Sequence, residues 1–231
     1  VDNEVESAAV GLLHAYANPR HEQRVRDLLR EALPSLPVTL ASEVCPEVRE
    51  YERLSTACAN AYVQPLMSRY LVSLADALRE ARVACPFLLM TSGGGRTTLE
   101  TATAFPIRLV ESGPAGGAIL ASHVARQCGL DRVISFDMGG TTAKLCIIDD
   151  GQPLSSRHFE VARSYRFRRG SGLPVRVPVI EMVEIGAGGG SIASVDTMSR
   201  ITVGPLSAGS EPGPASYGRG GEQPTVTDAD V

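Results

Sequence analysis

The residues best suited to chemistry lie in one stretch, residues 133–151. Two apolar runs rich in β-branched side chains flank a tight turn, which predicts a strand, a turn and a second strand, with a further turn at 149–151. The first turn gathers a carboxylate, two glycines and two hydroxyl side chains: Asp137, Gly139, Gly140, Thr141 and Thr142. Glycines let a backbone approach an anion, threonines add donors, and an aspartate can hold a divalent cation directly or through water. The turn would fit a phosphate group with Mg²⁺, or it is an ordinary hairpin whose Gly and Thr only shape the bend.

A second glycine-rich loop follows the apolar run 86–90. Such a run between helices predicts a buried parallel strand, and its exit lies at the carboxyl end, where open α/β sheets bind ligands. The candidate ligand-binding residues in this loop are Ser92, Gly93 and Gly94. Further along, Ser112 could cap a helix predicted over 118–128 and leave its N–H groups facing an anion, although a plain helix entry explains this residue equally well.

The elements that must position these loops are predicted from periodicity. Apolar residues recur at helical spacing over 5–33, with a break at 18–21, which predicts two helices. Residues 38–41 are strand-like, and 48–83 carry the repeat of one long helix, which Pro65 should kink or divide. Gly129 should end the helix over 118–128.

The C-terminal part of the sequence is less regular. Arginines cluster between 157 and 176, which indicates an exposed basic loop facing solvent, a partner or a nucleotide. Residues 177–185 are strand-like and lead into the glycine run of 186–190. From Gly204 onward frequent Gly and Pro predict an irregular stretch with little regular structure.

Composition narrows the class of protein. With 231 residues, 43% of them hydrophobic, the chain can bury a globular core. A net charge of −4, from 22 basic and 26 acidic residues without a sustained basic run, gives no electrostatic footprint for nucleic acid. No apolar run approaches the roughly 18 residues that span a bilayer, and the first residues lack a signal-peptide profile, so we expect no membrane association and a cytoplasmic location.

Cysteine and histidine give no sign of a disulfide framework or a zinc site. The cysteines are scattered without CxxC spacing and are expected to be small buried apolar residues: Cys45, Cys58, Cys85, Cys128 and Cys146. The histidines are equally dispersed and are expected to be structural or exposed.

Several motifs, taken in order along the chain, resemble the hydantoinase A and 5-oxoprolinase family. The matching segments are 50–53, 92–95, 112–117, 136–142, 186–193, 204–209, 212–218 and 225–229. This family includes ATP-dependent subunits of N-methylhydantoinase and 5-oxoprolinase and related subunits of acetone and acetophenone carboxylases. It is similar in fold to the actin, sugar-kinase and heat-shock chaperone ATPases.

The resemblance implies an α/β fold of the actin-like ATPase (ribonuclease H-like) type, present only in part. In that fold two lobes of the same topology clasp ATP, and each lobe opens with a phosphate-binding hairpin. Residues 1–130 are then expected to be the helix-rich back half of the first lobe. Residues 131–231 are expected to begin the second lobe, with its phosphate-binding hairpin and the Gly/Pro-rich segment, so the chain would be the central fragment of a longer subunit.

The resemblance also implies a mechanism. ATP would phosphorylate the oxygen of a stable cyclic amide such as N-methylhydantoin or 5-oxoproline, and water would attack the activated carbon. Asp137 would be the catalytic and metal-binding residue that holds Mg²⁺. The phosphates would be cradled by Gly139, Gly140, Thr141 and Thr142, with Ser92, Gly93 and Gly94 facing the same cleft from the other lobe. The implied partner is a hydantoinase B-type subunit in a heteromeric complex, and an oligomer is expected.

Two other functions would use the same cleft. One is an ATP-dependent ketone carboxylase, and the other is a non-catalytic, nucleotide-gated scaffold. The isolated fragment is expected to be inactive and to bind nucleotide weakly, because half of the cleft would be missing. Many family members continue the phosphate motif with a second acidic residue, whereas Ala143 and Lys144 follow it here, so Lys144 would either contact phosphate or point away.

Overall fold

The chain forms two compact units in the computed structural model, which describes residues 4–165 and 170–231. Unit 1 comprises Val1–Gly116 and Ser155–Ile180, and unit 2 comprises Gly117–Leu154 and Glu181–Val231. These units differ from the expected lobes, because 155–180 belongs to unit 1 and 117–130 to unit 2. The boundary between lobes at residue 130 therefore stays a prediction.

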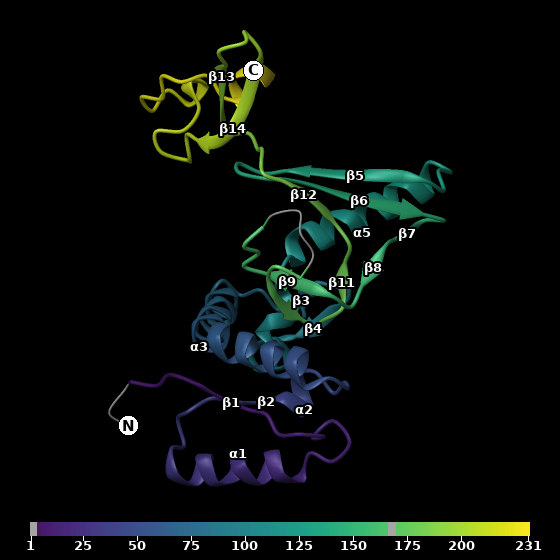
Figure 1. Ribbon diagram of the computed structural model, residues 1–231, viewed down its shortest axis with the longest axis vertical. Coiled ribbons are helices and arrows are strands. Elements are labelled where there is room, and N and C mark those ends of the chain that lie inside the picture. Colours follow the sequence, from purple (N-terminus) through teal and green to yellow (C-terminus); the bar gives the residue numbers. More distant parts are fainter. Residues whose placement is uncertain (1–3, 166–169) are drawn as a thin grey trace. The chain divides into compact units, whose positions relative to one another are not determined.

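Unit 1 is rich in helices and contains only short strands (Figure 1). Its helical elements are α1 (Arg20–Ala32), α2 (Ala41–Val44), α3 (Glu50–Glu80), α4 (Leu99–Ala104), the 3₁₀ helix η1 (Pro106–Leu109) and the first turn of α5 (Ser112–Gln127). Its strands are β1 (Ala8–Val10), β2 (Val38–Leu40), β3 (Leu88–Met90), β4 (Arg96–Thr98), β8 (Ser155–Ser156), β9 (Phe159–Val161), β10 (Leu173–Val175) and β11 (Val179–Ile180).

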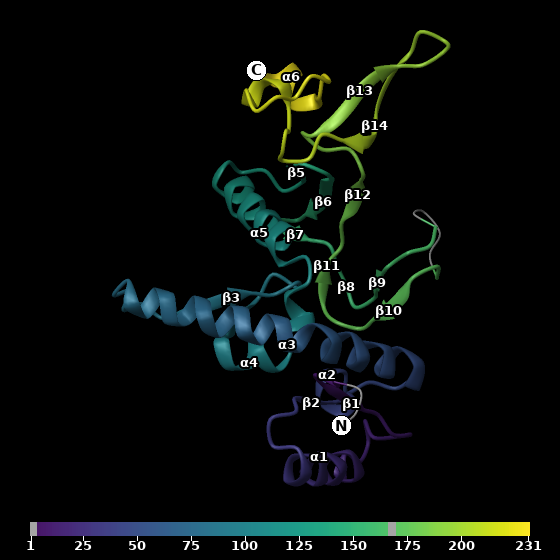
Figure 2. The ribbon, with the colours of Figure 1, turned by 90° about the vertical axis from the view of Figure 1, so that its left-hand side faces the viewer.

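The prediction of two helices over 5–33 is wrong for the first of them. Residues Ala8–Val10 form β1, which pairs in parallel with β2, and only α1 is helical. Both strands lie between α1 and α3 (Figure 2). Alanine and valine fit either pattern, and the strand is chosen by its partner at 38–40, which lies far away in the sequence.

The long predicted helix is confirmed as α3, but the division at Pro65 is wrong. The helix runs without interruption from Glu50 to Glu80 and contains Pro65 in its interior. Its N-terminal half carries three fully buried polar residues, Arg53, Thr56 and Asn60. Asn60 donates to Thr39 and to the carbonyl of Ala104, and it accepts from the amide of Ile107, so tertiary contacts hold this helix in place.

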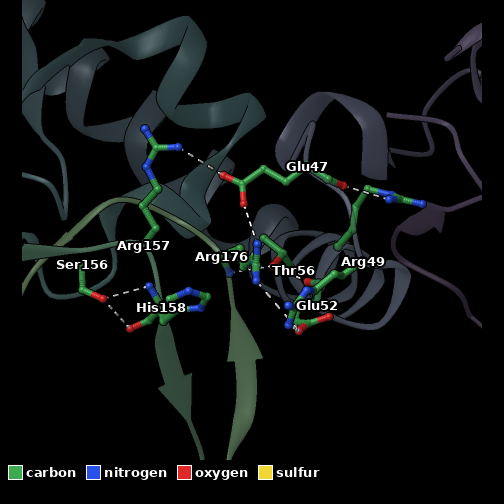
Figure 3. A network of polar contacts seen from close by, with 9 residues as sticks. Glu47, Arg49, Glu52, Thr56, Ser156, Arg157, His158 and Arg176 are labelled. Carbon is green, nitrogen blue, oxygen red and sulfur yellow. Dashed lines mark hydrogen bonds and ion pairs between the residues drawn. The ribbon is translucent and has the colours of Figure 1, made fainter. Parts of the chain in front are cut away.

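A polar network in unit 1 joins α3 to the segment that carries β9 and β10. The Glu47 carboxylate lies 2.8 Å from Arg176 and 3.7 Å from Arg157, and the two arginines flank the β9–β10 hairpin (Figure 3). The Arg176 amide also donates to the Thr56 hydroxyl. The Arg176 side chain is only 12% exposed, so the expectation of an exposed basic loop over 157–176 is wrong at its C-terminal end. Residues 166–169 of this predicted loop lie outside the described residues.

The run 86–90 does not form the predicted buried parallel strand. β3 pairs with β4 in an antiparallel hairpin, and Leu88 remains 46% exposed. The buried core of unit 1 lies instead around α2, α3 and η1, where alternate residues Val175, Val177 and Val179 point inward.

Unit 2 contains a small antiparallel sheet, a separate two-stranded sheet and the rest of α5. The strands are β5 (Val133–Met138), β6 (Ala143–Asp149), β7 (Gln152–Pro153), β12 (Val183–Ile185), β13 (Ser191–Val195) and β14 (Ile201–Ser207), and the C-terminal elements are η2 (Ala215–Tyr217) and α6 (Val226–Asp230). The first sheet consists of β5, β6, β7 and β12, with β6 between β5 and β12, and the separate sheet consists of β13 and β14. The buried hydroxyl of Ser122 on α5 donates to the carbonyl of Gly151, which anchors the helix to the turn after β6.

Three further predictions about these regions need correction. α5 begins at Ser112 rather than at 118, so Ser112 is its first helical residue and not a residue that precedes it. The run 177–185 is divided into β11 and β12. The stretch from Gly204 onward is more regular than predicted, because β14 extends through Gly204 to Ser207 and is followed by η2 and α6.

Cysteine burial was only partly predicted. Cys45 and Cys146 are buried, whereas Cys58, Cys85 and Cys128 are exposed, and all five thiols are free. In the parts of the chain that the structure describes, no helix is both long enough and apolar enough to cross a membrane.

Candidate functional site

The predicted hairpin at 133–149 is confirmed. β5 and β6 pair from Val133 opposite Ile148 to Met138 opposite Ala143, which leaves residues 139–142 as the connecting turn. The amide of Gly139 donates to the carbonyl of Thr142 over 2.9 Å and closes the turn. Residues 139–141 are exposed. We call residues 139–142 the phosphate turn.

Asp137 lies in the sheet just before the phosphate turn. It is directly opposite Lys144 on β6, and Lys144 is directly opposite Glu184 on β12. Direct partners project from the same face of an antiparallel sheet, so these three charged residues form one row across it. Asp137 is exposed, and α5 passes close by, because a Cβ on Gly117 would lie 4.0 Å from the Asp137 Oδ2 atom. Lys144 therefore lies beside Asp137.

The second glycine run packs directly against the phosphate turn. The amide of Gly189 donates to the carbonyl of Gly139 over 2.9 Å, and the amide of Gly190 donates to the carbonyl of Gly140 over 2.8 Å. A Cβ on Gly188 would stand 2.6 Å from the Gly139 oxygen, a distance that real Cβ atoms essentially never adopt. We call residues 188–190 the glycine brace.

The brace determines where the turn presents its donors. In a planar trans peptide the C=O and the following N–H point in opposite directions. Because the brace binds the carbonyls of Gly139 and Gly140, the N–H groups of Gly140 and Thr141 are directed away from it. Neither N–H donates to another group among the described residues, and both residues are exposed. Two successive free amides that closely follow an aspartate in the chain are suited to an anion that arrives with a cation.

The Ser92 loop lies in unit 1 and is largely occupied by internal hydrogen bonds. The hydroxyl and the amide of Ser92 both donate to the carbonyl of Arg108, over 2.7 and 2.8 Å, and the side chain is buried. Gly94 adopts a left-handed φ of 79° in the turn between β3 and β4, and its amide donates to Thr91. The Ser92 side chain is therefore not available to a ligand, whereas Gly93 is exposed, and the role of Ser92, Gly93 and Gly94 remains a prediction.

Within residues 4–165 and 170–231, no three His, Cys, Asp or Glu side chains gather as a metal cluster. A cation at Asp137 would therefore be held by this carboxylate together with water and ligand oxygens. That donor set suits Mg²⁺, which keeps several waters and is commonly bound through one or two carboxylates and substrate phosphates.

Sequence reasoning missed the brace and the capping residue of α6, the helix whose Thr227 amide donates to the Gly189 carbonyl. The run 186–190 was recognised as glycine-rich, but its contact with the phosphate turn joins segments far apart in the sequence. Asp228 was missed as well. Its signal is the spacing of Thr225 and Asp228, which form a capping box at α6.

Comparison with known proteins identifies the class to which this chain belongs. The family model described as Hydantoinase/oxoprolinase matches residues 53–231, so the chain belongs to the hydantoinase/oxoprolinase family. The predicted resemblance is confirmed.

Relatives in this family carry several names. The chain is 42% identical over 229 residues to an uncharacterized protein of Methanocaldococcus jannaschii, 37% identical over 230 residues to the caprolactamase subunit alpha of Pseudomonas jessenii, and 34% identical over 238 residues to the acetophenone carboxylase gamma subunit of Aromatoleum aromaticum. The matches cover 98%, 100% and 100% of this chain but 34%, 32% and 31% of the relatives. The chain thus spans about a third of the length of these proteins.

Two solved structures share the fold. The ATP-dependent caprolactamase from Pseudomonas jessenii matches with a TM-score of 0.74 and 37% identity, over 99% of this chain and 32% of that chain. Nucleotide-free acetone carboxylase matches with a TM-score of 0.74 and 27% identity, over 96% of this chain and 31% of that chain. The α/β class is confirmed, and the matches are consistent with part of an actin-like ATPase fold.

Proposed function

We propose that this chain supplies one phosphate-binding half of an ATP-dependent enzyme that opens cyclic amides. The observation that carries the proposal is the pair of undonated amides at Gly140 and Thr141, which belong to exposed residues, are directed by the brace and follow Asp137 closely in the chain. The solved relatives support it, since one is an ATP-dependent caprolactamase and the other is an acetone carboxylase, whose carboxylation is ATP-dependent.

Asp137 and the residues of the phosphate turn would have separate roles in binding MgATP. The amides of Gly140 and Thr141, with the hydroxyls of Thr141 and Thr142, would bind the terminal phosphates of ATP, and Asp137 would hold Mg²⁺ directly or through water. A bound Mg²⁺ would neutralise charge on the phosphates during transfer. Lys144, beside Asp137, would add positive charge where many other family members have an acid.

The chemistry would proceed through an activated amide. The amide oxygen attacks the γ-phosphorus, the bond to the β-phosphate oxygen breaks, and ADP leaves. Water then attacks the activated carbon, the C–N bond breaks with a proton passing to nitrogen, and a second water releases inorganic phosphate. Phosphorylation of the amide oxygen makes the amide carbon electrophilic enough for attack by water, which the carbon of an unmodified cyclic amide resists.

The substrate class is a small cyclic amide, such as a hydantoin, 5-oxoproline or caprolactam. The relatives named caprolactamase and 5-oxoprolinase support this choice, with 37% and 32% identity to the chain. A ketone carboxylase is the second candidate, because acetophenone and acetone carboxylase subunits are 34% and 29% identical to this chain.

We further propose a B-type partner subunit, Mg²⁺ as the metal and a cytoplasmic location. The relatives named subunit alpha and subunit gamma support the proposal of a partner subunit.

The experiment is an assay of substrate-dependent ATP hydrolysis. The full-length protein with its partner subunit is incubated with MgATP and, separately, with hydantoins, 5-oxoproline, caprolactam, or acetone plus bicarbonate. Phosphate release that depends on a cyclic amide supports the proposal, and release that requires ketone and bicarbonate supports the carboxylase. ATP turnover unaffected by all of these compounds would favour a nucleotide-gated scaffold.

A further inference from the structure

We propose that Asp228 is a positioning residue that sets the phosphate turn through the glycine brace. This inference rests on the proposed function and adds to it a residue far from the turn in sequence. It depends on three successive contacts within unit 2, each made by the backbone or a short side chain.

The first contact fixes α6. The Asp228 carboxylate accepts from the amide of Ser216 over 2.7 Å, from the amide of Thr225 over 2.8 Å and from the Thr225 hydroxyl over 2.9 Å. The Thr225 hydroxyl accepts from the Asp228 amide in return, which completes the capping box. The hydrogen bonds from these amides, that of Ser216 first, hold the pKa of Asp228 well below its usual range. One charged group therefore joins η2 to the first turn of α6.

The second contact joins α6 to the brace. The amide of Thr227, next to Asp228, donates to the carbonyl of Gly189 over 2.9 Å. The Thr227 hydroxyl lies so close that a Cβ on Gly189 would stand 2.6 Å from its oxygen. The third contact is the hydrogen bond from the Gly189 amide to the Gly139 carbonyl.

The direction of the phosphate-binding amides thus depends on α6. If Asp228 no longer holds α6, the Thr227 amide loses its fixed place, the brace loosens from Gly189 onward, and the peptide after Gly139 loses the hydrogen bond that directs it. Hydrogen bonds to a charged acceptor are strong and short. Removing the charge of Asp228 should therefore weaken the contacts of α6, of the brace and of the phosphate turn in succession.

The test compares Asp228→Asn with Asp230→Asn in the full-length protein. Asp230 lies in the same helix and is exposed, so its variant makes the same charge change away from the contacts. Hydrogen exchange at the Gly189 and Gly190 amides should accelerate about tenfold in Asp228→Asn and stay unchanged in Asp230→Asn. Dissociation constants for MgATP and MgADP should rise about tenfold in Asp228→Asn, while that of adenosine, which has no phosphate, should not change.

A second pair of variants tests the contact between Thr227 of α6 and Gly189 of the brace. Gly189→Ala should weaken MgATP binding, because its Cβ would clash with the Thr227 hydroxyl. Adding Thr227→Ala removes that atom and leaves the nearest other contacts at 3.8 and 4.0 Å, so the double variant should bind like wild type.

Each result decides the proposal. Equal exchange at the brace in Asp228→Asn and Asp230→Asn would overturn it, whether or not the protein binds ATP. Equal loss of adenosine and MgATP affinity would also overturn it, because general loss of structure would then explain the effect. If wild type itself does not bind MgATP, the proposed function fails, and the exchange comparison still decides whether Asp228 positions the turn.

Discussion

The backbones of Gly188 and Thr141 are in such close contact that a Cβ on Gly188 would stand 2.6 Å from the Thr141 amide nitrogen. The same Cβ would also stand 2.6 Å from the Gly139 carbonyl oxygen. Both atoms belong to the backbone, which cannot rotate out of the way as a side chain can. Gly188 does not have a left-handed φ, so this close contact, and not the backbone conformation, explains why the position requires glycine.

Gly188→Ala should reduce ATP hydrolysis by the full-length protein at least about tenfold, because the phosphate turn must shift by several tenths of an ångström. Gly113→Ala is the matched control, since a Cβ there meets nothing within 4 Å and Gly113 lies in α5. Steady-state phosphate release measures both variants. Full activity in Gly188→Ala would show that the turn tolerates displacement or does not bind phosphate.

Glu47→Gln should lower the free energy of unfolding by about 2 kcal/mol, because it leaves the mostly buried Arg176 without its closest carboxylate. The remaining acid, Glu52, is 4.0 Å from Arg176. Arg157→Gln should cost less than about 1 kcal/mol, since that arginine is 77% exposed and its pair with Glu47 spans 3.7 Å. Urea unfolding monitored by circular dichroism compares the two, and equal losses would contradict the unequal roles of the two arginines.

Cys58, Cys85 and Cys128 should react with a thiol reagent in the native protein, whereas Cys45 and Cys146 should react only after unfolding. Burial raises the pKa of both the Cys45 and Cys146 thiols, which lowers their thiolate fraction further. Mass spectrometry of labelled peptides identifies the modified residues. Rapid native labelling of Cys45 would mean that the core of unit 1 opens readily.

The stabilising effect of Asp228 should depend on pH. Its pKa is depressed in the folded state, chiefly by the Ser216 amide, so its contribution is present above the ordinary value of about 4 and is lost as pH falls through the folded pKa. The difference in unfolding free energy between wild type and Asp228→Asn should therefore be constant above about pH 5 and shrink below pH 4. Urea titrations at several pH values measure it. A difference that stays constant down to pH 2 would argue against an ionised, hydrogen-bonded Asp228.

The sequence predicts best the features that local pattern controls. The β5–β6 hairpin was predicted because apolar runs flank a turn rich in glycine, and α3 was predicted because its repeat persists over many turns. Pro65 removes one hydrogen bond from α3, yet the buried contacts of Asn60 and its neighbours outweigh that loss and keep the helix continuous.

The sequence predicts poorly what distant contacts decide. Ala8–Val10 became a strand because Val38–Leu40 lies alongside it, and no local signal separates a short helix from a strand in such a segment. The brace was visible only as a glycine run, since its partner at 139–141 lies nearly 50 residues away. Asp228 had a recognisable capping-box signal, but its connection to the phosphate turn required three contacts that only the structure supplies.

The most direct measurement of the central claim is ATP hydrolysis by Asp137→Asn in the full-length protein with its partner subunit. The variant keeps the shape of the side chain but removes the charge that would hold Mg²⁺ beside the phosphate turn. We predict a normal circular dichroism spectrum and a loss of amide-dependent phosphate release of at least about a hundredfold. Wild-type turnover in Asp137→Asn would contradict the assignment of Asp137 and of the phosphate turn.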